Sequence, residues 1–137
     1  MKTKEPAYRH RSVLLVDDNE LDNFINHKTI EASLFAETIY TATNGKSAID
    51  FIRNLLLMDD ARYPEVIFVD LNMPLMDGFQ FIEYCRNEPL IAEKKIRLVV
   101  LTSSLNDQDK EKVAAYMRGI KFLNKPLTEK MLEVLDK

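Results

Sequence analysis

Three aspartates in two short segments have the types and spacing to hold a metal ion. Asp17 and Asp18 follow the apolar run at residues 13–16, and Asp70 follows the apolar run at residues 66–69. Neighbouring strands lie about 4.8 Å apart, so adjacent strands would bring these carboxylates within several ångströms of one another. Carboxylates this close repel one another, and a hard cation such as Mg²⁺ relieves that repulsion. A helix cap explains either Asp17 or Asp18 alone, but the three acids together favour a metal site.

Five strand patterns alternate with five helical patterns along the chain. Continuous apolar runs with no exposed face are typical of parallel strands that are covered on both sides. The strand patterns lie at residues 12–17, 38–42, 65–70, 96–102 and 120–123. The helical patterns lie at residues 20–33, 44–58, 78–88, 107–118 and 128–136. With right-handed crossovers, this order predicts an α/β fold with an open, doubly wound parallel sheet and helices on both faces.

The polar residues that end these strands should therefore meet at one edge of the sheet. In open α/β sheets, sites form at the carboxyl ends of the strands. Asp17, Asp18, Asp70 and Thr102 each stand at such an end. The convergence of three acids and a hydroxyl is the main indication of function.

The helical patterns differ in how clearly they mark a buried face. In the first helix, Leu21, Phe24 and Ile25 lie on one side and form a modest apolar stripe. The second has a stronger stripe and a candidate N-cap at Asn44. Pro89 is expected to end the third helix.

Length and charge narrow the class of protein further. A chain of 137 residues fits one domain, and we expect a flexible N-terminal extension at residues 1–11, which includes His10, before a domain at residues 12–137. The net charge is −3 and the basic residues are scattered, which argues against nucleic-acid binding by this chain alone. No segment is typical of a signal peptide or a membrane span. The single cysteine, Cys85, fits a reducing cytoplasm and is expected to be buried.

Four motifs in order give the chain a family resemblance. They are LLVDDNE at residues 14–20, VIFVDLNMPLMDG at 66–78, VVLTSS at 99–104 and FLNKP at 122–126. Together they resemble the receiver domains of response regulators in two-component signalling, from residue 12 to the end of the chain. The resemblance implies a flavodoxin-like, five-stranded sheet in the order 2-1-3-4-5. It also implies a stand-alone regulator without an output domain.

The resemblance implies a role for each polar residue at the predicted edge. Asp70 would be the nucleophile and the phosphorylated residue, and Lys125 would pair with the phosphoryl oxygens. Asp17, Asp18 and Asp70, with the backbone carbonyl of Asn72, would bind Mg²⁺. One cation and one lysine suffice, because phosphoryl transfer needs mainly positioning and charge neutralisation.

The resemblance also implies a switch. The Thr102 hydroxyl would turn to the phosphoryl group, and Phe122, which is equally well explained as a core residue, would move inward. Ser103 stands where the family more often has alanine or glycine, so it competes as the switch hydroxyl or narrows phosphoryl access. The small polar Asn72 and Ser104 leave a water path open, so we expect a short-to-moderate phosphoryl lifetime.

Taken together, the motifs predict a phosphoacceptor that is not an enzyme beyond its own phosphorylation and dephosphorylation. Its partner would be a sensor histidine kinase or a histidine phosphotransfer protein, docked near the first helix and the Lys125 loop. A degenerate receiver that binds partners without phosphorylation is the alternative. A phosphohydrolase resembling haloacid dehalogenases is rejected because Asn72 replaces its second acid. A flavodoxin is rejected because the acidic run at residues 17–23 repels phosphate.

Overall fold

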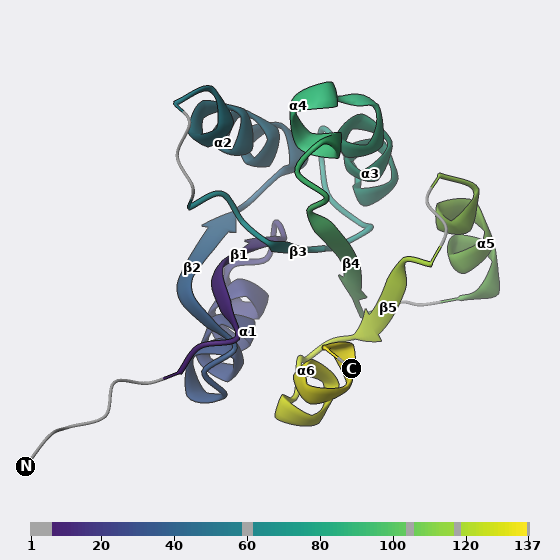
Figure 1. Ribbon diagram of the computed structural model, residues 1–137. Helices are drawn as coiled ribbons and strands as arrows, with labels where there is room; N and C mark the ends of the chain where they lie inside the picture. Colours follow the sequence, from purple (N-terminus) through teal and green to yellow (C-terminus); the bar gives the residue numbers. More distant parts are fainter. Residues whose placement is uncertain (1–6, 59–61, 104–105, 117–118, 137) are drawn as a thin grey trace, which may run out of the picture.

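The computed structural model describes residues 7–58, 62–103, 106–116 and 119–136 (Figure 1). The strands are β1 (His10–Val16), β2 (Ala36–Ala42), β3 (Val66–Val69), β4 (Arg97–Thr102) and β5 (Lys121–Asn124). The helices are α1 (Glu20–Ala32), α2 (Gly45–Leu57), α3 (Gly78–Asn87), α4 (Pro89–Ala92), α5 (Asp107–Tyr116) and α6 (Glu129–Leu135). The strands are all parallel and form one sheet in the order β2-β1-β3-β4-β5, which confirms the predicted fold.

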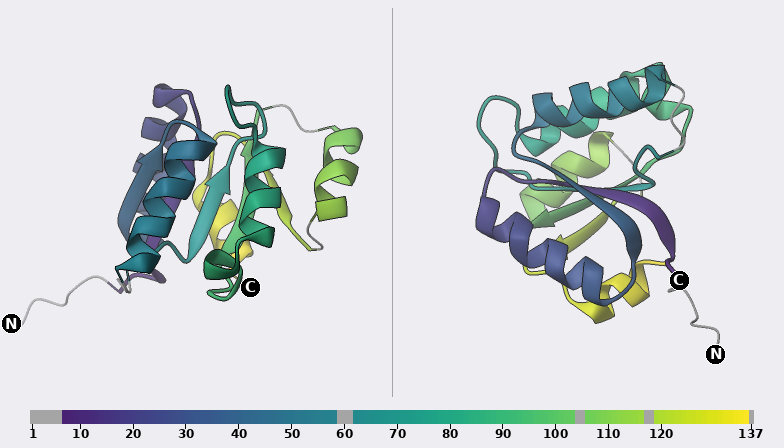
Figure 2. Two further views of the ribbon diagram at one scale, coloured as in Figure 1. Left: turned by 90° about the horizontal axis from the view of Figure 1, so that it is seen from above. Right: turned by 90° about the vertical axis from the view of Figure 1, so that its left-hand side faces the viewer.

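The sheet separates two layers of helices (Figure 2). Side chains alternate between the two faces of a strand. Val13 and Leu15 therefore join the core beneath α1 and α6, whereas Leu14 and Val16 join the core beneath α2 and α3. Because both faces are covered, residues 13–16 of β1 and the whole of β3 are apolar without a break, as their sequences indicated.

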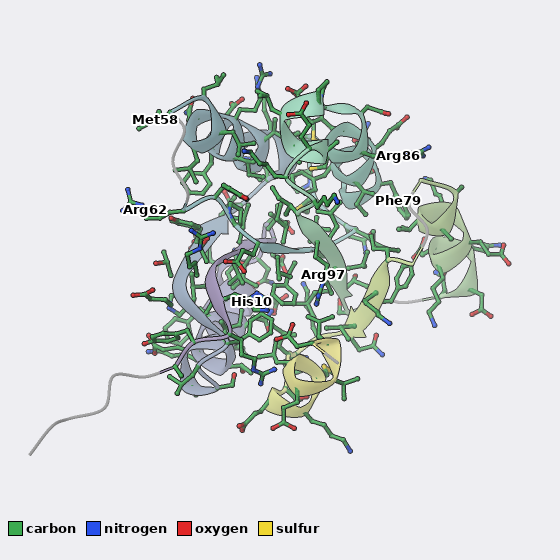
Figure 3. All side chains as sticks on the ribbon, viewed as in Figure 1. His10, Met58, Arg62, Phe79, Arg86 and Arg97 are labelled. Carbon is green, nitrogen blue, oxygen red and sulfur yellow. The ribbon has the colours of Figure 1, made fainter. Side chains whose placement is uncertain are left out.

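The first strand begins earlier than predicted. The sequence pattern predicts an N-terminal extension that includes His10 and Arg11, but both residues belong to β1. His10 N donates to Phe35 O at 2.9 Å, and the His10 ring lies 3.0 Å from both Glu65 Oε1 and Asp136 Oδ1. Figure 3 shows the His10 side chain beside the sheet and close to α6. These contacts hold the start of the strand in place.

The buried face of α1 also differs from the prediction. Leu21 and Phe24 are 65% and 59% exposed, whereas Asn23 and Asn26 are buried. Each asparagine is buried because its amide is used: Asn23 Nδ2 donates to Asp17 O at 2.9 Å, and Asn26 Oδ1 accepts from Leu127 N at 3.0 Å. These two hydrogen bonds, together with the buried Ile30, hold this helix against the sheet.

The remaining expectations concern helix ends and the cysteine. Asn44 caps α2 by accepting a hydrogen bond from Ser47 N at 2.8 Å, as predicted. Pro89 ends α3 but then starts the short helix α4, because proline is tolerated at the first helical position. Cys85 is buried as expected, and burial raises the pKa of its thiol to about 12. None of the helices that the structure describes has the length and hydropathy needed to span a bilayer.

Candidate functional site

The register of the parallel strands brings the predicted acids together. Val16 pairs with Val69, so that Asp17 and Asp70 follow at the same edge of the sheet. Asp70 N continues the ladder by donating to Val16 O at 3.0 Å. One carboxylate oxygen from each of Asp17, Asp18 and Asp70 lies within 4.8 Å of the others. The predicted acidic cluster is therefore present at the carboxyl ends of β1 and β3.

The loop between β1 and α1 holds two of these acids in different surroundings. Asp17 is 4% exposed, and its Oδ1 accepts a hydrogen bond from Asn19 N at 2.9 Å. Burial raises the pKa of Asp17, although a hydrogen bond from Lys125 opposes that shift. Asp18 is exposed and faces solvent. The cluster thus has a buried side and an open side.

Lys125 places an ammonium group among the acids. Its Nζ lies 3.0 Å from Asp70 Oδ2 and 2.8 Å from Asp22 Oδ2, and it also pairs with Asp17. Burial of the side chain, which is 8% exposed, lowers the pKa of Lys125. The hydrogen bonds to the three acids outweigh that effect and raise the pKa overall. The ammonium therefore stays charged and neutralises part of the cluster.

The backbone after β5 fixes the position of Lys125. Its N–H donates to Thr102 O at 3.0 Å, and the bond to Pro126 is cis. The next residue, Leu127, donates its N–H to Asn26 of α1. The lysine is thus tied to β4 on one side and to α1 on the other.

Asp22 is the site residue that the sequence reasoning missed. It lies in the first turn of α1, where an acidic side chain interacts favourably with the helix dipole. That interaction alone accounts for an acid at this position, so the sequence gives no reason to expect a contact with Lys125. Its signal in the sequence is a third aspartate, which closes the run DDNELD. The contact with Lys125 crosses 103 positions, so only the fold reveals it.

Thr102 ends β4 with its side chain completely buried. Its hydroxyl oxygen has no hydrogen-bond partner among the residues that the structure describes. A buried hydroxyl without a partner costs about 1–3 kcal/mol, so this group is poised to accept or donate a bond. Ser103 is exposed and Ser104 lies outside the described residues. Of Thr102 and Ser103, it is therefore Thr102 that the fold buries.

Two other predicted residues lie close to this edge of the sheet. Asn72 N donates to Asp70 Oδ1 at 3.3 Å, so the loop after β3 folds back over the nucleophile candidate. Phe122 pairs with Val100 in the sheet and is half-buried against the core beneath α2 and α3.

Gly78 allows α3 to begin directly beside β3. A Cβ atom at this position would lie 2.6 Å from Leu71 Cα, too close for any side chain. Gly78 N donates to Leu71 O at 2.9 Å, and Asp77 caps the helix in a capping box with Gln80. The glycine that ends the motif at residues 66–78 thus has a steric reason.

The sequence of residues 13–135 matches the family described as Response regulator receiver domain. The chain belongs to this family, and it is a receiver domain of the two-component response regulators. The acidic cluster and the sheet order are those that the family resemblance implied.

Individual relatives agree with this assignment. Response regulator Rcp1 of Synechocystis sp. is 28% identical over 97 residues, which are 71% of this chain and 65% of Rcp1. The chain therefore spans slightly less than two thirds of the length of that relative. The crystal structure of a two component response regulator from Cytophaga hutchinsonii has a TM-score of 0.81 and 32% identity, and covers 92% of this chain and 93% of its own. The phosphorylated cyanobacterial phytochrome response regulator RcpA has a TM-score of 0.72 and 25% identity, with 92% and 88% covered.

Proposed function

We propose that Asp70 accepts a phosphoryl group from a sensor histidine kinase or a histidine phosphotransfer protein, in a reaction that depends on Mg²⁺. The observation that carries the proposal is the position of the Lys125 ammonium, 3.0 Å from Asp70 within a cluster of three carboxylates. The one charged nitrogen that reaches this cluster, among the residues described, comes from the residue that the family motif assigns to phosphoryl binding.

The chemistry follows from the groups at the site. An oxygen of the Asp70 carboxylate attacks phosphorus, and the bond between phosphorus and the donor's histidine nitrogen breaks. The electron pair of that bond returns to the nitrogen, which leaves a neutral imidazole after it takes up a proton. No general base is needed, because an ionised carboxylate carries no proton to remove. The protein's task is to position the reactants and to offset charge on the equatorial oxygens.

The donor set suits Mg²⁺. Asp17, Asp18 and Asp70 offer hard carboxylate oxygens close together, and the backbone carbonyl of Asn72 is the fourth proposed ligand. When bound, Mg²⁺ neutralises negative charge on the cluster and on the phosphoryl oxygens. The exposure of Asp18 leaves that side open to water and to a phosphoryl donor.

Thr102 and Phe122 are proposed to carry the switch. The unpartnered Thr102 hydroxyl would donate to a phosphoryl oxygen on Asp70, a charge-assisted bond stronger than a neutral one. The similarity to RcpA, whose structure is that of a phosphorylated response regulator, supports this role for the site. Phe122 lies on the neighbouring strand and would follow the movement of Thr102.

We propose that the protein is cytoplasmic and that its partner docks beside the site on α1. Leu21 and Phe24 are both more than half exposed on this helix, which begins next to the acidic cluster. Beyond its own phosphorylation and dephosphorylation, the domain is proposed to have no catalytic activity.

The test uses acetyl phosphate as the donor and intact mass spectrometry as the readout. We expect a phosphate-sized mass gain in the wild type with Mg²⁺, none in Asp70→Asn, and none after Mg²⁺ is chelated. No gain in the wild type, with acetyl phosphate or with a phosphorylated kinase, would contradict the proposal and favour the alternative, a receiver that binds partners without phosphorylation.

A further inference from the structure

The ammonium group of Lys125 is surrounded by three carboxylates. Asp17 and Asp70 come from the ends of β1 and β3, whereas Asp22 comes from the first turn of α1. A lysine ammonium has three N–H donors, so the three acids together saturate it. Two of these acids belong to the proposed metal and phosphoryl site, and the third has no role there.

Asp22 occupies a fixed position relative to the lysine. Its backbone N–H donates to the capping residue Asn19 at 3.0 Å, at the start of the helix. The same helix is tied to the loop that carries Lys125, because Asn26 Oδ1 accepts from Leu127 N at 3.0 Å. Helix and loop therefore form one unit in which the carboxylate and the ammonium face each other.

We infer that Asp22 is a positioning residue for Lys125, an inference that rests on the proposed phosphoryl transfer to Asp70. A lysine side chain is long and flexible, and it loses rotamer freedom when its ammonium is fixed. When Asp17 and Asp70 turn to a cation and a phosphoryl group, the bond to Asp22 still holds the ammonium. Two N–H donors then remain for the phosphoryl oxygens.

The distances indicate that Asp22 positions the Lys125 ammonium and does not compete with Asp70 for it. Lys125 Nζ lies 2.8 Å from Asp22 and 3.0 Å from Asp70 at the same time. Asp22 therefore does not draw the ammonium away from the nucleophile. Its negative charge does repel an anionic donor, so loss of Asp22 should have two opposite effects: tighter donor binding and slower reaction of the bound donor.

The test measures initial rates of phosphorylation over a range of acetyl phosphate concentrations, with Mg²⁺ at saturation. We expect Asp22→Asn to lower the maximal rate about tenfold and to leave KM unchanged or lower. Glu20→Gln is the matched control, because it removes the same charge from an exposed residue in the same turn of α1. Its maximal rate should equal that of the wild type.

A double-mutant cycle identifies Lys125 as the group through which Asp22 acts. In a Lys125→Ala background, followed over correspondingly longer times, Asp22→Asn should have no further effect on the maximal rate. An equal loss in both backgrounds would overturn the inference, because the loss would then not pass through the lysine.

A spectroscopic signature tests the contact itself without donor or metal. In ¹H–¹⁵N spectra of the lysine ammonium groups, we expect the Lys125 signal to be resolved in the wild type and in Glu20→Gln. It should broaden by faster exchange with water in Asp22→Asn. An unchanged signal, or an Asp22→Asn protein whose maximal rate of phosphorylation equals or exceeds that of the wild type, would overturn the inference. A wild type that is not phosphorylated at all would overturn the proposed function, and with it the role of Asp22 in that reaction.

Discussion

The Lys125 ammonium donates a hydrogen bond of 3.0 Å to Asp70 Oδ2 across 55 positions of the sequence. The two residues follow β5 and β3, which do not pair directly because β4 lies between them. The contact depends on the backbone after β5, which the bond from Lys125 N to Thr102 O turns back across the end of β4. The positive charge of Lys125, at the end of β5, thus contacts the nucleophile candidate Asp70 at the end of β3.

Mg²⁺ is expected to stabilise the wild type against unfolding. A cation that binds only the folded state at 100 times its Kd adds about 2.7 kcal/mol to the free energy of unfolding. Asp18→Asn should remove most of this gain, because the exposed Asp18 is one of three carboxylates in the cluster. Thermal unfolding with and without Mg²⁺ measures the effect. Asp50→Asn, an exposed acid on α2, is the control and should keep the full gain, and a loss there would point to a general salt effect.

Thr102→Val is expected to raise the free energy of unfolding by about 1 kcal/mol in the unphosphorylated protein. The substitution keeps the shape of the side chain and removes a buried hydroxyl that lacks a partner. Ser12→Ala is the contrasting variant, because the buried Ser12 hydroxyl donates to the carbonyl oxygens of Arg62 and Tyr63 at 2.9 Å. It should lower the free energy by about 1 kcal/mol. Urea denaturation measures the free energy of unfolding of both variants. A Thr102→Val protein that is less stable than the wild type would show that the Thr102 hydroxyl is hydrogen-bonded.

Asn26→Ala is expected to lower the free energy of unfolding by about 2 kcal/mol. The change leaves the N–H of Leu127 buried without its acceptor, and Leu127 is only 3% exposed. Leu21→Ala on the exposed side of the same helix should change the free energy by less than about 0.5 kcal/mol. Urea denaturation measures both free energies of unfolding. The expected order, with the larger loss from Asn26→Ala, is the opposite of the order that the apolar pattern of α1 suggests. A larger loss from Leu21→Ala than from Asn26→Ala would show that α1 packs through its apolar stripe after all.

The parts of the fold that could be predicted share one physical cause. A strand segment covered on both faces must be apolar throughout, so residues 13–16 of β1, 66–69 of β3 and 98–101 of β4 are visible in the sequence as continuous apolar runs. Parallel strands also bring their carboxyl ends to one edge, and this places Asp17 beside Asp70 from sequence order alone. The sheet and the acidic cluster could therefore be predicted from the sequence.

The parts that could not be predicted depend on specific hydrogen bonds. Asn23 and Asn26 appear polar in the helical pattern of α1, and only their bonds to Asp17 O and Leu127 N explain their burial. The same holds for Asp22, whose partner is more than a hundred positions away. His10 appeared to belong to a polar tail because its partners Glu65 and Asp136 lie far along the chain.

The hydrogen bonds around Glu65 predict how stability depends on pH. Burial raises the pKa of Glu65, but the bonds from Arg11 N and His10 Nδ1, both 3.0 Å long, outweigh burial and lower it below its ordinary 4.5. A lowered pKa in the folded state means that the carboxylate stabilises the fold above pH 4.5. That contribution is lost as the pH falls through the folded-state pKa.

Glu65→Gln is therefore expected to be less stable than the wild type near neutral pH, by about 0.5–1 kcal/mol for this partly exposed group. The difference should shrink as the pH falls below 4.5, because the wild-type carboxyl then takes up a proton. Urea denaturation at several pH values between 7 and 3 measures both free energies. Glu37→Gln, an exposed acid on β2, is the control, and its difference from the wild type should stay small throughout. A Glu65→Gln deficit that is constant with pH would show that lost packing, rather than the carboxylate charge, causes it.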